Sequence, residues 1–227
     1  NNKKKIIAII PARSGSKGLK NKNIKKFDKK PLIYWTINSA LKSKYIDKCF
    51  VSTDSKKISD ISNKFGADTS FLRPSILSSD KSEISSTIIH VLKNIKENFD
   101  IIILLQPTSP LRDNNDIDKA LRIFIRKNLT SLVSISSCDY PYEWILKKNK
   151  LNEVNFVNNN KSKNRQQAKS YFQANGAIYI STTKNYLRNK TFFNNKTYGF
   201  LMNKSKSIDI DDIIDFKIAE IIKKSNE

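Results

Sequence analysis

The loop at residues 11–23, PARSGSKGLKNKN, combines glycines, small hydroxyl residues and closely spaced cations. Its two glycines allow backbone N–H groups to approach a ligand. The glycines are Gly15 and Gly18, and the cations are Arg13, Lys17, Lys20 and Lys22. Such a loop suits a polyphosphate, although a flexible connector with solvated lysines is the simpler alternative. The spacing matches neither the P-loop nor the GxGxxG pattern, so it indicates a nucleotide phosphate without an ATPase or a dehydrogenase.

A second group that could do chemistry is the pair Asp209 and Asp211 in the segment SIDIDD. Alternation with Ile208 and Ile210 places both carboxylates on one side of an extended segment, where like charges repel unless a cation neutralises them. A hard divalent cation such as Mg²⁺ prefers such oxygen ligands. Helix capping is the alternative: we expect Asp211 or Asp212 to cap the following helix, but capping leaves Asp209 unexplained.

Two further loops carry groups that could contact a nucleotide or a sugar. Arg73 opens a loop through Ser85 whose hydroxyls, Ser82 among them, could bind a base or a phosphate, whereas ordinary helix capping would explain the same residues. Gln106 begins the segment QPTSPLR, which ends at Arg112. The two prolines of this segment make the loop rigid, and its glutamine could hydrogen-bond to a sugar or a base.

The elements that position these loops alternate along the chain. The apolar run Ile6–Ile10 predicts a strand buried on both faces, which Pro11 ends. Further strands are expected at 49–53, 69–72, 100–105 and 131–135. One helix is expected to begin at Pro31 and a second to end at about Phe65, and three more are expected around 88–95, over 115–126 and over 213–224. This alternation predicts an α/β fold with a parallel sheet, which would deliver the loops to the edge where such sheets bind ligands.

The stretch from 138 to 169 lacks the apolar periodicity of the rest of the chain. It is too long for an ordinary loop, so we interpret it as an excursion that forms a flap or an oligomer contact. Three of its aromatic residues are candidate interface anchors: Tyr140, Tyr142 and Trp144. The strand-like segment 171–181 follows, and its Asn175-Gly176 is as compatible with a hairpin turn as with a binding site.

The composition bounds the class of protein. The chain has 227 residues, 38% of them hydrophobic, and can bury one substantial core. It has no apolar run of about 20 residues and no secretory signal, so a cytoplasmic protein without a membrane partner is expected. Cys49 and Cys138 fit neither a disulfide framework nor a zinc site and are expected to be buried free thiols.

The net charge of +21 invites a nucleic-acid interpretation. However, only seven of the 42 basic residues are arginine, and the lysines are spread along the chain rather than clustered with aromatic residues. The pattern therefore favours a lysine-biased surface with no nucleic-acid partner, and a basic RNA-binding module remains an alternative.

Four segments together resemble one known family: IIPARSGSKGLKNKN, LLQPTSPLR, RQQ followed by FQANGAIYI, and SIDIDDIIDFKIAE. This set is similar to the acylneuraminate cytidylyltransferases, the family of CMP-sialic acid synthetases and their relatives that act on legionaminic-type sugars. Each motif is moderately specific by itself, whereas the set, in the family's order over nearly the whole chain, is highly specific.

The resemblance implies a Rossmann-like three-layer nucleotidyltransferase fold with a mainly parallel sheet. It further implies a single cytidylyltransferase domain over 1–227, with an insertion at about 138–170 that mediates homodimerisation or forms a flap. The implied reaction joins CTP to a nine-carbon acidic sugar by in-line attack of the anomeric hydroxyl on the α-phosphate, giving the CMP-sugar and pyrophosphate.

The same resemblance assigns roles by motif match. Nucleotide contacts fall on Ala12, Arg13, Ser16, Lys17, Lys22, Asn23, Arg73 and Ser82. Sugar contacts fall on Gln106, Arg165, Gln173, Tyr179, Phe192 and Phe193, although an ordinary core explains these three aromatic residues equally well. Asp209 and Asp211 would hold Mg²⁺, Arg13 and Lys17 would neutralise charge on the phosphates, and Asp211 would help to remove the hydroxyl proton.

Departures from the family pattern leave the acceptor sugar open. Gln173 stands where sialic-acid enzymes often have an arginine, whereas Gly-Ser-Lys-Gly followed by Lys-Asn argues against a Kdo enzyme. The alternatives are another sugar nucleotidyltransferase, acting on Kdo or pseudaminic acid or using a different base, and a nucleotide-sugar glycosyltransferase with an Asp-x-Asp metal site.

Overall fold

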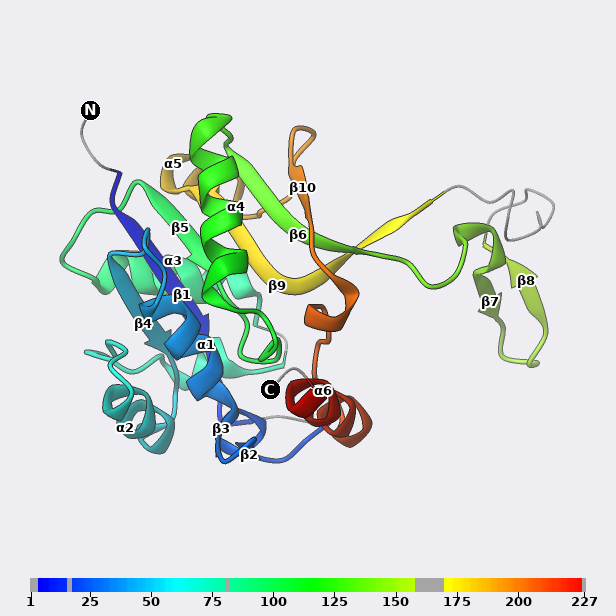
Figure 1. Ribbon diagram of the computed structural model, residues 1–227, viewed down its shortest axis with the longest axis horizontal. Helices are drawn as coiled ribbons and strands as arrows, with labels where there is room; N and C mark the ends of the chain where they lie inside the picture. The colour runs from blue at the N-terminus through cyan, green and yellow to red at the C-terminus, as the bar shows by residue number, and fades with distance from the viewer. Residues whose placement is uncertain (1–3, 16–17, 81, 158–169, 226–227) are drawn as a thin grey trace.

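A six-stranded sheet in the order β10-β6-β9-β5-β1-β4 forms the middle layer of the computed structural model (Figure 1). The structure describes residues 4–15, 18–80, 82–157 and 170–225. The strands of this sheet are β1 (Ile6–Pro11), β4 (Lys48–Ser52), β5 (Ile101–Leu104), β6 (Ser131–Ser137), β9 (Phe172–Thr182) and β10 (Tyr198–Leu201). β1 is parallel to β4 and β5, and β10 is parallel to β6, whereas β9 is antiparallel to both of its neighbours. The mainly parallel sheet expected from the sequence is thus confirmed.

Helices cover both faces of the sheet. They are α1 (Leu32–Leu41), α2 (Lys56–Lys64), α3 (Ile84–Asn94), α4 (Asn114–Arg126), α5 (Thr183–Asn189) and α6 (Ile213–Ser225). Ile6, Ala8 and Ile10 share one buried cluster with side chains of α1, α2 and α4. Ile7 and Ile9 face the opposite cluster, which α3 and α5 cover. Because successive side chains of β1 point into two different cores, its sequence is apolar without interruption. The sheet between two layers of helices is the predicted three-layer α/β architecture.

A third, smaller cluster joins α6 to the start of the chain. It packs Phe27 and Leu32 against Ile210 and Phe216. The short elements around it are β2 (Lys26–Phe27), β3 (Lys30–Pro31) and the 3-10 helices η1 (Lys22–Ile24) and η5 (Lys204–Lys206), and the 3-10 helix η2 (Ser75–Ser78) precedes α3. In Figure 1, α6 lies beside β2 and β3, so the first and last parts of the chain meet at one end of the sheet.

The strand predicted at 69–72 is wrong. The chain makes one isolated bridge to the edge strand β4, from Asp68 to Phe50, and then leaves it. The amide of Ser70 donates to Asp68 Oδ1 at 2.8 Å, a local bond that turns the backbone where a ladder would have continued. The pattern of apolar residues does not indicate where a side chain will replace the hydrogen bonds of a strand, so this pattern gave a wrong prediction.

The Asn175-Gly176 pair lies inside β9 and does not form a hairpin turn. β9 is continuous, but its register with β6 shifts between Val133 and Ile135. Gly176 has φ +77°, a conformation that favours glycine. The irregularity is therefore a bulge in a long strand, which corrects the hairpin alternative.

The excursion from 138 to 157 projects away from the sheet (Figure 1). It contains the 3-10 helix η3 (Tyr142–Trp144) and a hairpin of β7 (Leu146–Lys148) with β8 (Val154–Phe156). Many of its large apolar side chains are exposed: Tyr140, Tyr142, Trp144, Ile145, Leu146, Leu151, Val154, Phe156 and Val157. A lobe this small cannot bury these side chains within itself.

The cysteine prediction holds for one residue and fails for the other. Both thiols are free. Cys49 is buried in β4, and burial raises the pKa of its thiol to about 12, whereas Cys138 is partly exposed at the root of the excursion. Among the described residues, no helix is long and apolar enough to cross a bilayer.

Asp118 on α4 joins this helix to the end of α1, and its substitution tests how much this link stabilises the fold. Its carboxylate, which is buried, accepts from Ser43 Oγ at 2.6 Å and from the backbone amide of Lys44 at 3.2 Å, just after α1. Because Asp118→Ala leaves these donors without an acceptor, we predict a loss of about 1–3 kcal/mol in the free energy of unfolding, measured in urea. Asp60→Ala on α2, which removes only an exposed i,i+4 pair with Lys56, should cost less than about 0.5 kcal/mol. Equal losses in both variants would contradict this account.

Candidate active site

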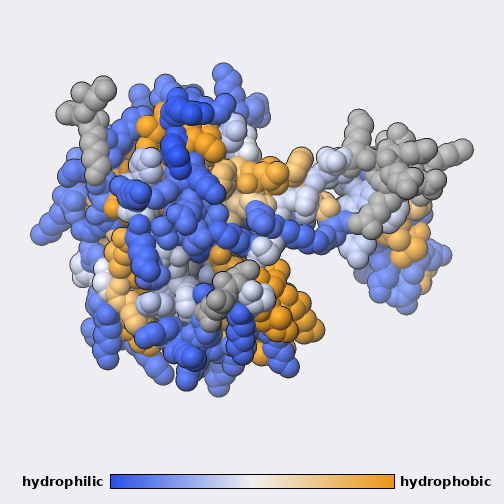
Figure 2. Space-filling view, viewed as in Figure 1, coloured by the Kyte–Doolittle hydropathy of each residue, from blue (hydrophilic) through white to orange (hydrophobic). Residues whose placement is uncertain are grey.

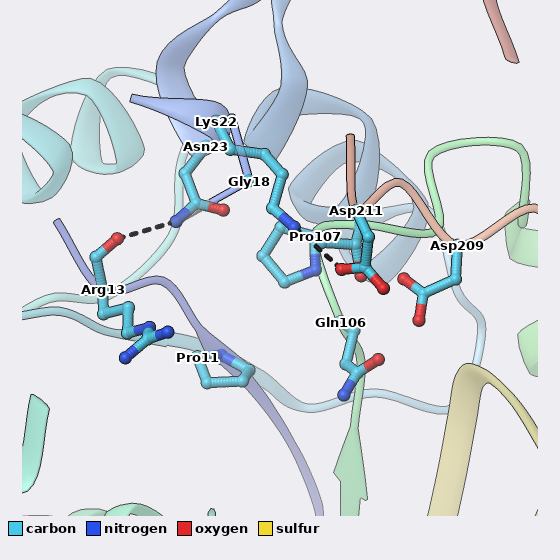
Figure 3. A pocket seen from close by; sticks show the side chains of 10 residues that line it. Pro11, Arg13, Gly18, Lys22, Asn23, Gln106, Pro107, Asp209 and Asp211 are labelled. Atoms are coloured by element: carbon cyan, nitrogen blue, oxygen red, sulfur yellow. Dashed lines mark hydrogen bonds and ion pairs between the residues drawn. The ribbon is translucent and has the colours of Figure 1, made fainter. Parts of the chain in front are cut away.

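A cleft of about 450 Å³ opens at the carboxyl ends of β1 and β5 (Figure 3). Such sheets bind ligands at this edge. The cleft is lined by Pro11, Arg13, Gly18, Lys22, Asn23, Gln106, Pro107, Thr108, Asp209 and Asp211. Three segments that are distant in the sequence therefore meet here: the loop after β1, the loop after β5 and the segment before α6.

The loop after β1 is fastened on two sides. Asn23, which is buried, donates from Nδ2 to the backbone carbonyl of Arg13 at 2.9 Å. Ser14 donates its amide and its hydroxyl to the Asp54 carboxylate, at 2.9 and 2.6 Å. Burial raises the pKa of Asp54, but the bonds from Ser14 outweigh it and hold that pKa below its usual value. Asp54 is therefore an ionised anchor, and it keeps Arg13 at the mouth of the cleft.

The segment that carries Asp209 and Asp211 packs against this loop. Lys22 Nζ donates to the carbonyl of Ile210 at 2.7 Å and lies 3.2 Å from Asp211 Oδ1. A Cβ at Gly18 would lie 2.3 Å from the carbonyl oxygen of Asp211, so no other residue fits there without displacing backbone. The amide of Ile210 in turn donates to the carbonyl of Thr108 at 2.8 Å. The segment carrying the carboxylates is thus held between the first loop and the loop after β5.

Asp209 and Asp211 both point into the cleft (Figure 3). Burial raises the pKa of Asp209, and the charge of Asp211 adds to the effect, while a hydrogen bond from Thr108 opposes it. Within the described part of the chain, Asp209 Oδ1 is buried and has no hydrogen-bond partner. A buried carboxylate oxygen beside a second carboxylate is a donor set that fits a hard divalent cation.

This pair does not form a complete metal cage by itself. Over the ranges that the structure describes, no cluster of three or more His, Cys, Asp or Glu side chains could hold a metal ion. That arrangement still fits Mg²⁺, which usually takes one or two carboxylates and completes its octahedron with phosphate oxygens and water.

Helix capping accounts for the side chain of Asp212 and does not engage the carboxylates of Asp209 and Asp211. Asp212 Oδ1 accepts from the amides of Ile214 at 2.7 Å and Asp215 at 3.0 Å. Asp215 Oδ2 accepts in return from the amide of Asp211 at 2.9 Å. The expectation that one of Asp211 and Asp212 caps α6 is confirmed for Asp212.

A second cleft, of about 260 Å³, shares Pro11 and Arg13 with the first. Its other lining residues are Arg73, Leu77, Ser78, Ser79, Asp80, Ser82, Ile84 and Thr87. Arg13 Nη1 lies 2.7 Å from Asp80 Oδ1 on this side. The two clefts therefore adjoin at Arg13, and together they could hold a ligand with one end in each.

Arg73 is only 6% exposed, which is unusual for a charged side chain. Its Nη1 donates to Thr87 Oγ1 at 2.9 Å, while Nε and Nη2 have no hydrogen-bond partner among the residues described. Burial lowers the pKa of Arg73, and the nearby charge of Asp54 raises it. Two unused donors on a buried cation beside a cleft are a binding feature for a group with acceptor atoms.

The structure places the remaining predicted contacts at varying distances from the clefts. Ala12 is fully buried, and its amide donates to the carbonyl of Ser52 at 2.9 Å, so it extends the sheet and does not line either cleft. Gln173 is exposed on β9 opposite Ser136 and likewise lines neither cleft. Ser16, Lys17 and Arg165 lie outside the described residues.

The predicted aromatic pocket is partly core. Phe192 is 4% exposed and packs on Tyr186 at a ring-centroid distance of 4.7 Å, whereas Phe193 is 53% exposed. Tyr179 contacts both phenylalanines, at 5.6 and 6.2 Å. Burial raises the pKa of Tyr179, and the charge of Asp209 adds to this effect. None of these three aromatic residues is among the described residues that line the two clefts.

Sequence reasoning missed three contributors to the site. Asp54 anchors the first loop, Thr108 bonds the segment of the aspartates, and Pro107 forms part of the wall. The available signals were the position of Asp54 at the end of a buried strand and the two prolines around Thr108.

The sequence matches a known protein family over nearly its whole length. A model of the cytidylyltransferase family matches residues 7–226. The chain is 38% identical over 221 residues to the N-acylneuraminate cytidylyltransferase of Escherichia coli O18:K1:H7, covering 97% of this chain and 52% of that protein. It is 36% identical to the CMP-N,N'-diacetyllegionaminic acid synthase of Legionella pneumophila, with 98% of each chain covered, and 32% identical to a pseudaminic acid cytidylyltransferase of Campylobacter jejuni, covering 98% and 97%. The chain thus spans about half the length of some of the curated relatives it matches, and nearly all of others.

Solved structures share the fold. The synthetase for CMP-2-keto-3-deoxy-manno-octonic acid, solved in complex with CTP, superposes with a TM-score of 0.74 at 14% identity, covering 98% of this chain and 100% of that one. The 4-diphosphocytidyl-2C-methyl-D-erythritol synthase of Anaerococcus prevotii gives a TM-score of 0.66 at 15% identity, with the same coverage. At such identities the likeness supports the Rossmann-like fold alone. Taken with the family match over nearly the whole chain, the fold and the motifs show that this chain belongs to the cytidylyltransferase family.

Proposed function

We propose that this protein transfers CMP from CTP to a nine-carbon acidic sugar, with release of pyrophosphate and with Mg²⁺ as cofactor. The observation that carries the proposal is that Asp209 and Asp211 line one cleft together with Arg13 and Lys22. Carboxylates and cations in the same cleft at the edge of the sheet are what a metal-bound triphosphate requires.

The nucleotide is proposed to span both clefts, with its base beside Arg73 and its phosphates passing Arg13. Arg73 offers two unused donors, Nε and Nη2. Cytosine presents acceptors at O2 and N3, whereas uracil has an N–H at position 3 that would face a donor. A buried site with unpaired donors rejects the ligand that cannot accept from them, so this geometry favours CTP over UTP.

Catalysis is proposed to come mainly from positioning and charge. Arg13 and Lys22 neutralise the phosphates, and Gln106 orients the sugar from the opposite wall of the cleft. When bound, Mg²⁺ supplies electrostatic stabilisation of the phosphoryl oxygens and lowers the pKa of the attacking hydroxyl. Asp211, whose side chain is 82% exposed to solvent, is the candidate acceptor of the hydroxyl proton as the anomeric oxygen attacks the α-phosphorus.

The names of the relatives support an acidic sugar as the acceptor. Those proteins are named for N-acylneuraminate, diacetyllegionaminic acid and pseudaminic acid. In this chain, the exposed ring of Phe193 packs on Tyr179, and this pair is the proposed apolar surface for an acyl substituent. A cytoplasmic location, where thiols stay reduced, fits the two free cysteines.

The excursion is proposed to form the interface of a homodimer. Leu151 is 77% exposed and Val154 is 56% exposed, and the apolar residues around them make a patch of the kind that a partner covers. Figure 2 shows apolar surface on the projecting lobe, separate from the main body.

The metal assignment predicts that Asp209→Ala and Asp211→Ala each abolish Mg²⁺-dependent release of pyrophosphate from CTP and a nonulosonic acid. Asp212→Asn is the matched control, because it keeps an acceptor for the cap of α6 and should leave turnover near that of the wild type. Pyrophosphate release is measured by a coupled assay, with mass spectrometry to identify the CMP-sugar. Near-normal turnover of either alanine variant, with its circular dichroism unchanged, would remove the metal assignment.

The base assignment predicts that Arg73→Lys raises the KM for CTP about tenfold to a hundredfold and narrows the preference for CTP over UTP. Lysine keeps the charge but loses the planar donors, and a paired donor set is worth about 1–3 kcal/mol of discrimination. Arg122→Lys, on the exposed side of α4, should change neither quantity. The proposal fails if Arg73→Lys binds CTP and UTP as the wild type does.

The interface assignment predicts that Leu151→Asp together with Val154→Asp converts the dimer to a monomer in sedimentation equilibrium, because burying two unpaired charges is costly. Leu187→Asp, at a half-exposed site on α5, should remain dimeric. A wild-type protein that sediments as a monomer would exclude this interface.

A further inference from the structure

We propose that Asn175 is a positioning residue that fixes the segment carrying Asp209 and Asp211 to the sheet. The inference rests on the proposed function, because it assigns these aspartates to the metal. The bulge at Asn175-Gly176 is not explained by pairing, since the ladder between β6 and β9 would be more regular without it.

The side-chain amide of Asn175 joins three parts of the chain. Asn175 is 5% exposed, and its Oδ1 accepts from Ser134 Oγ at 2.5 Å and from the amide of Ala177 at 3.2 Å. Its Nδ2 donates to Ser207 Oγ at 2.9 Å. The Ser134 hydroxyl also accepts from the amide of Ile178 at 2.8 Å, which ties the bulge to β6 where the register shifts.

Ser207 links Asn175 to the segment that carries the two aspartates. It lies two residues before Asp209, and its hydroxyl also donates to the carbonyl of Asn203 at 2.8 Å. The segment 207–212 belongs to neither a strand nor a helix, so side-chain bonds help to set its position, together with the backbone bond from Ile210 to Thr108. After Asp209, the segment is held by the contacts of Lys22 with Ile210 and Asp211. Before Asp209, it is held by the bond from Asn175 to Ser207.

The backbone at Gly176, next to Asn175, lies against two side chains that line the cleft. A Cβ on Gly176 would lie 2.7 Å from Gln106 Oε1 and 3.0 Å from Asp209 Oδ2. The backbone of the bulge is therefore the surface against which both side chains rest. If the amide of Asn175 holds this backbone and Ser207 at once, it sets where the Asp209 carboxylate stands relative to Gln106.

Loss of this network should affect the affinity for the metal more than the affinity for the nucleotide base. Asp209 and Asp211 repel each other, so without a tether the segment can relax and separate them. Loss of the Asn175 bond should weaken metal binding. None of the described residues that line the cleft of Arg73 belongs to this network, so that cleft should keep its affinity for the base.

The test compares Ser207→Ala, Asn175→Ala and the double variant with the wild type. The readouts are Mn²⁺ affinity by electron paramagnetic resonance with CTP but no sugar, the Mg²⁺ concentration for half-maximal pyrophosphate release, and the KM for CTP at saturating Mg²⁺. We expect Ser207→Ala to weaken Mn²⁺ binding about fivefold, the effect of one hydrogen bond, with little change in the KM for CTP. The double variant should be no weaker than Asn175→Ala alone, and Ser207→Thr, which keeps the hydroxyl, should restore binding.

Asn185→Ala is the matched control, because Asn185 Nδ2 also bonds a serine hydroxyl of β9, Ser181 Oγ at 3.0 Å, but on α5 away from the cleft. It should leave Mn²⁺ affinity unchanged even if it lowers the melting temperature. If Asn175→Ala does not fold, Ser207→Ala alone decides. Folded variants with wild-type Mn²⁺ affinity would overturn the positioning role, whereas failure of the proposed function would instead appear as a wild type that releases no pyrophosphate.

Discussion

The repulsion between two neighbouring carboxylates is the constraint on which the site depends. Asp209 and Asp211 lie together in one cleft, and the charge of Asp211 helps to raise the pKa of Asp209. Lys22 relieves part of this repulsion through its contact with Asp211, and Gly18 allows the loop that carries Lys22 to pack directly on the backbone of residue 211. A bound cation would relieve the rest, which is why the arrangement is suited to a metal-bound triphosphate.

The sheet brings these groups together by directing the loops after β1 and β5 to the same edge. Both strands are buried on two faces and run parallel, so their polar ends are adjacent. Arg13 stands where the two clefts meet, and Asp54, at the end of the next parallel strand, fixes the loop beside it. A rigid scaffold of apolar strands thus supports a site that is built almost entirely from loops.

Much of this could be predicted from the sequence, because the signals were local. The uninterrupted apolar run of β1 indicated a strand between two cores, and the spacing of Asp209 and Asp211 indicated a shared face. Other features could not be predicted, because they depend on contacts between distant segments. The spacing of residues did not indicate that Gly18 touches the backbone of Asp211, that Asn175 bonds Ser207, or that the short β10 and α5 complete the sheet and its cover.

The central claim is that one metal ion joins the aspartate pair to a triphosphate that passes Arg13. The most direct measurement is a crystal structure with CTP and Mn²⁺, using the anomalous signal of manganese to locate the ion. The account predicts a Mn²⁺ peak bonded to carboxylate oxygens of both Asp209 and Asp211 and to phosphate oxygens, with the cytosine in the cleft of Arg73. A manganese peak remote from this pair, or CTP bound away from the edge of β1, would contradict it.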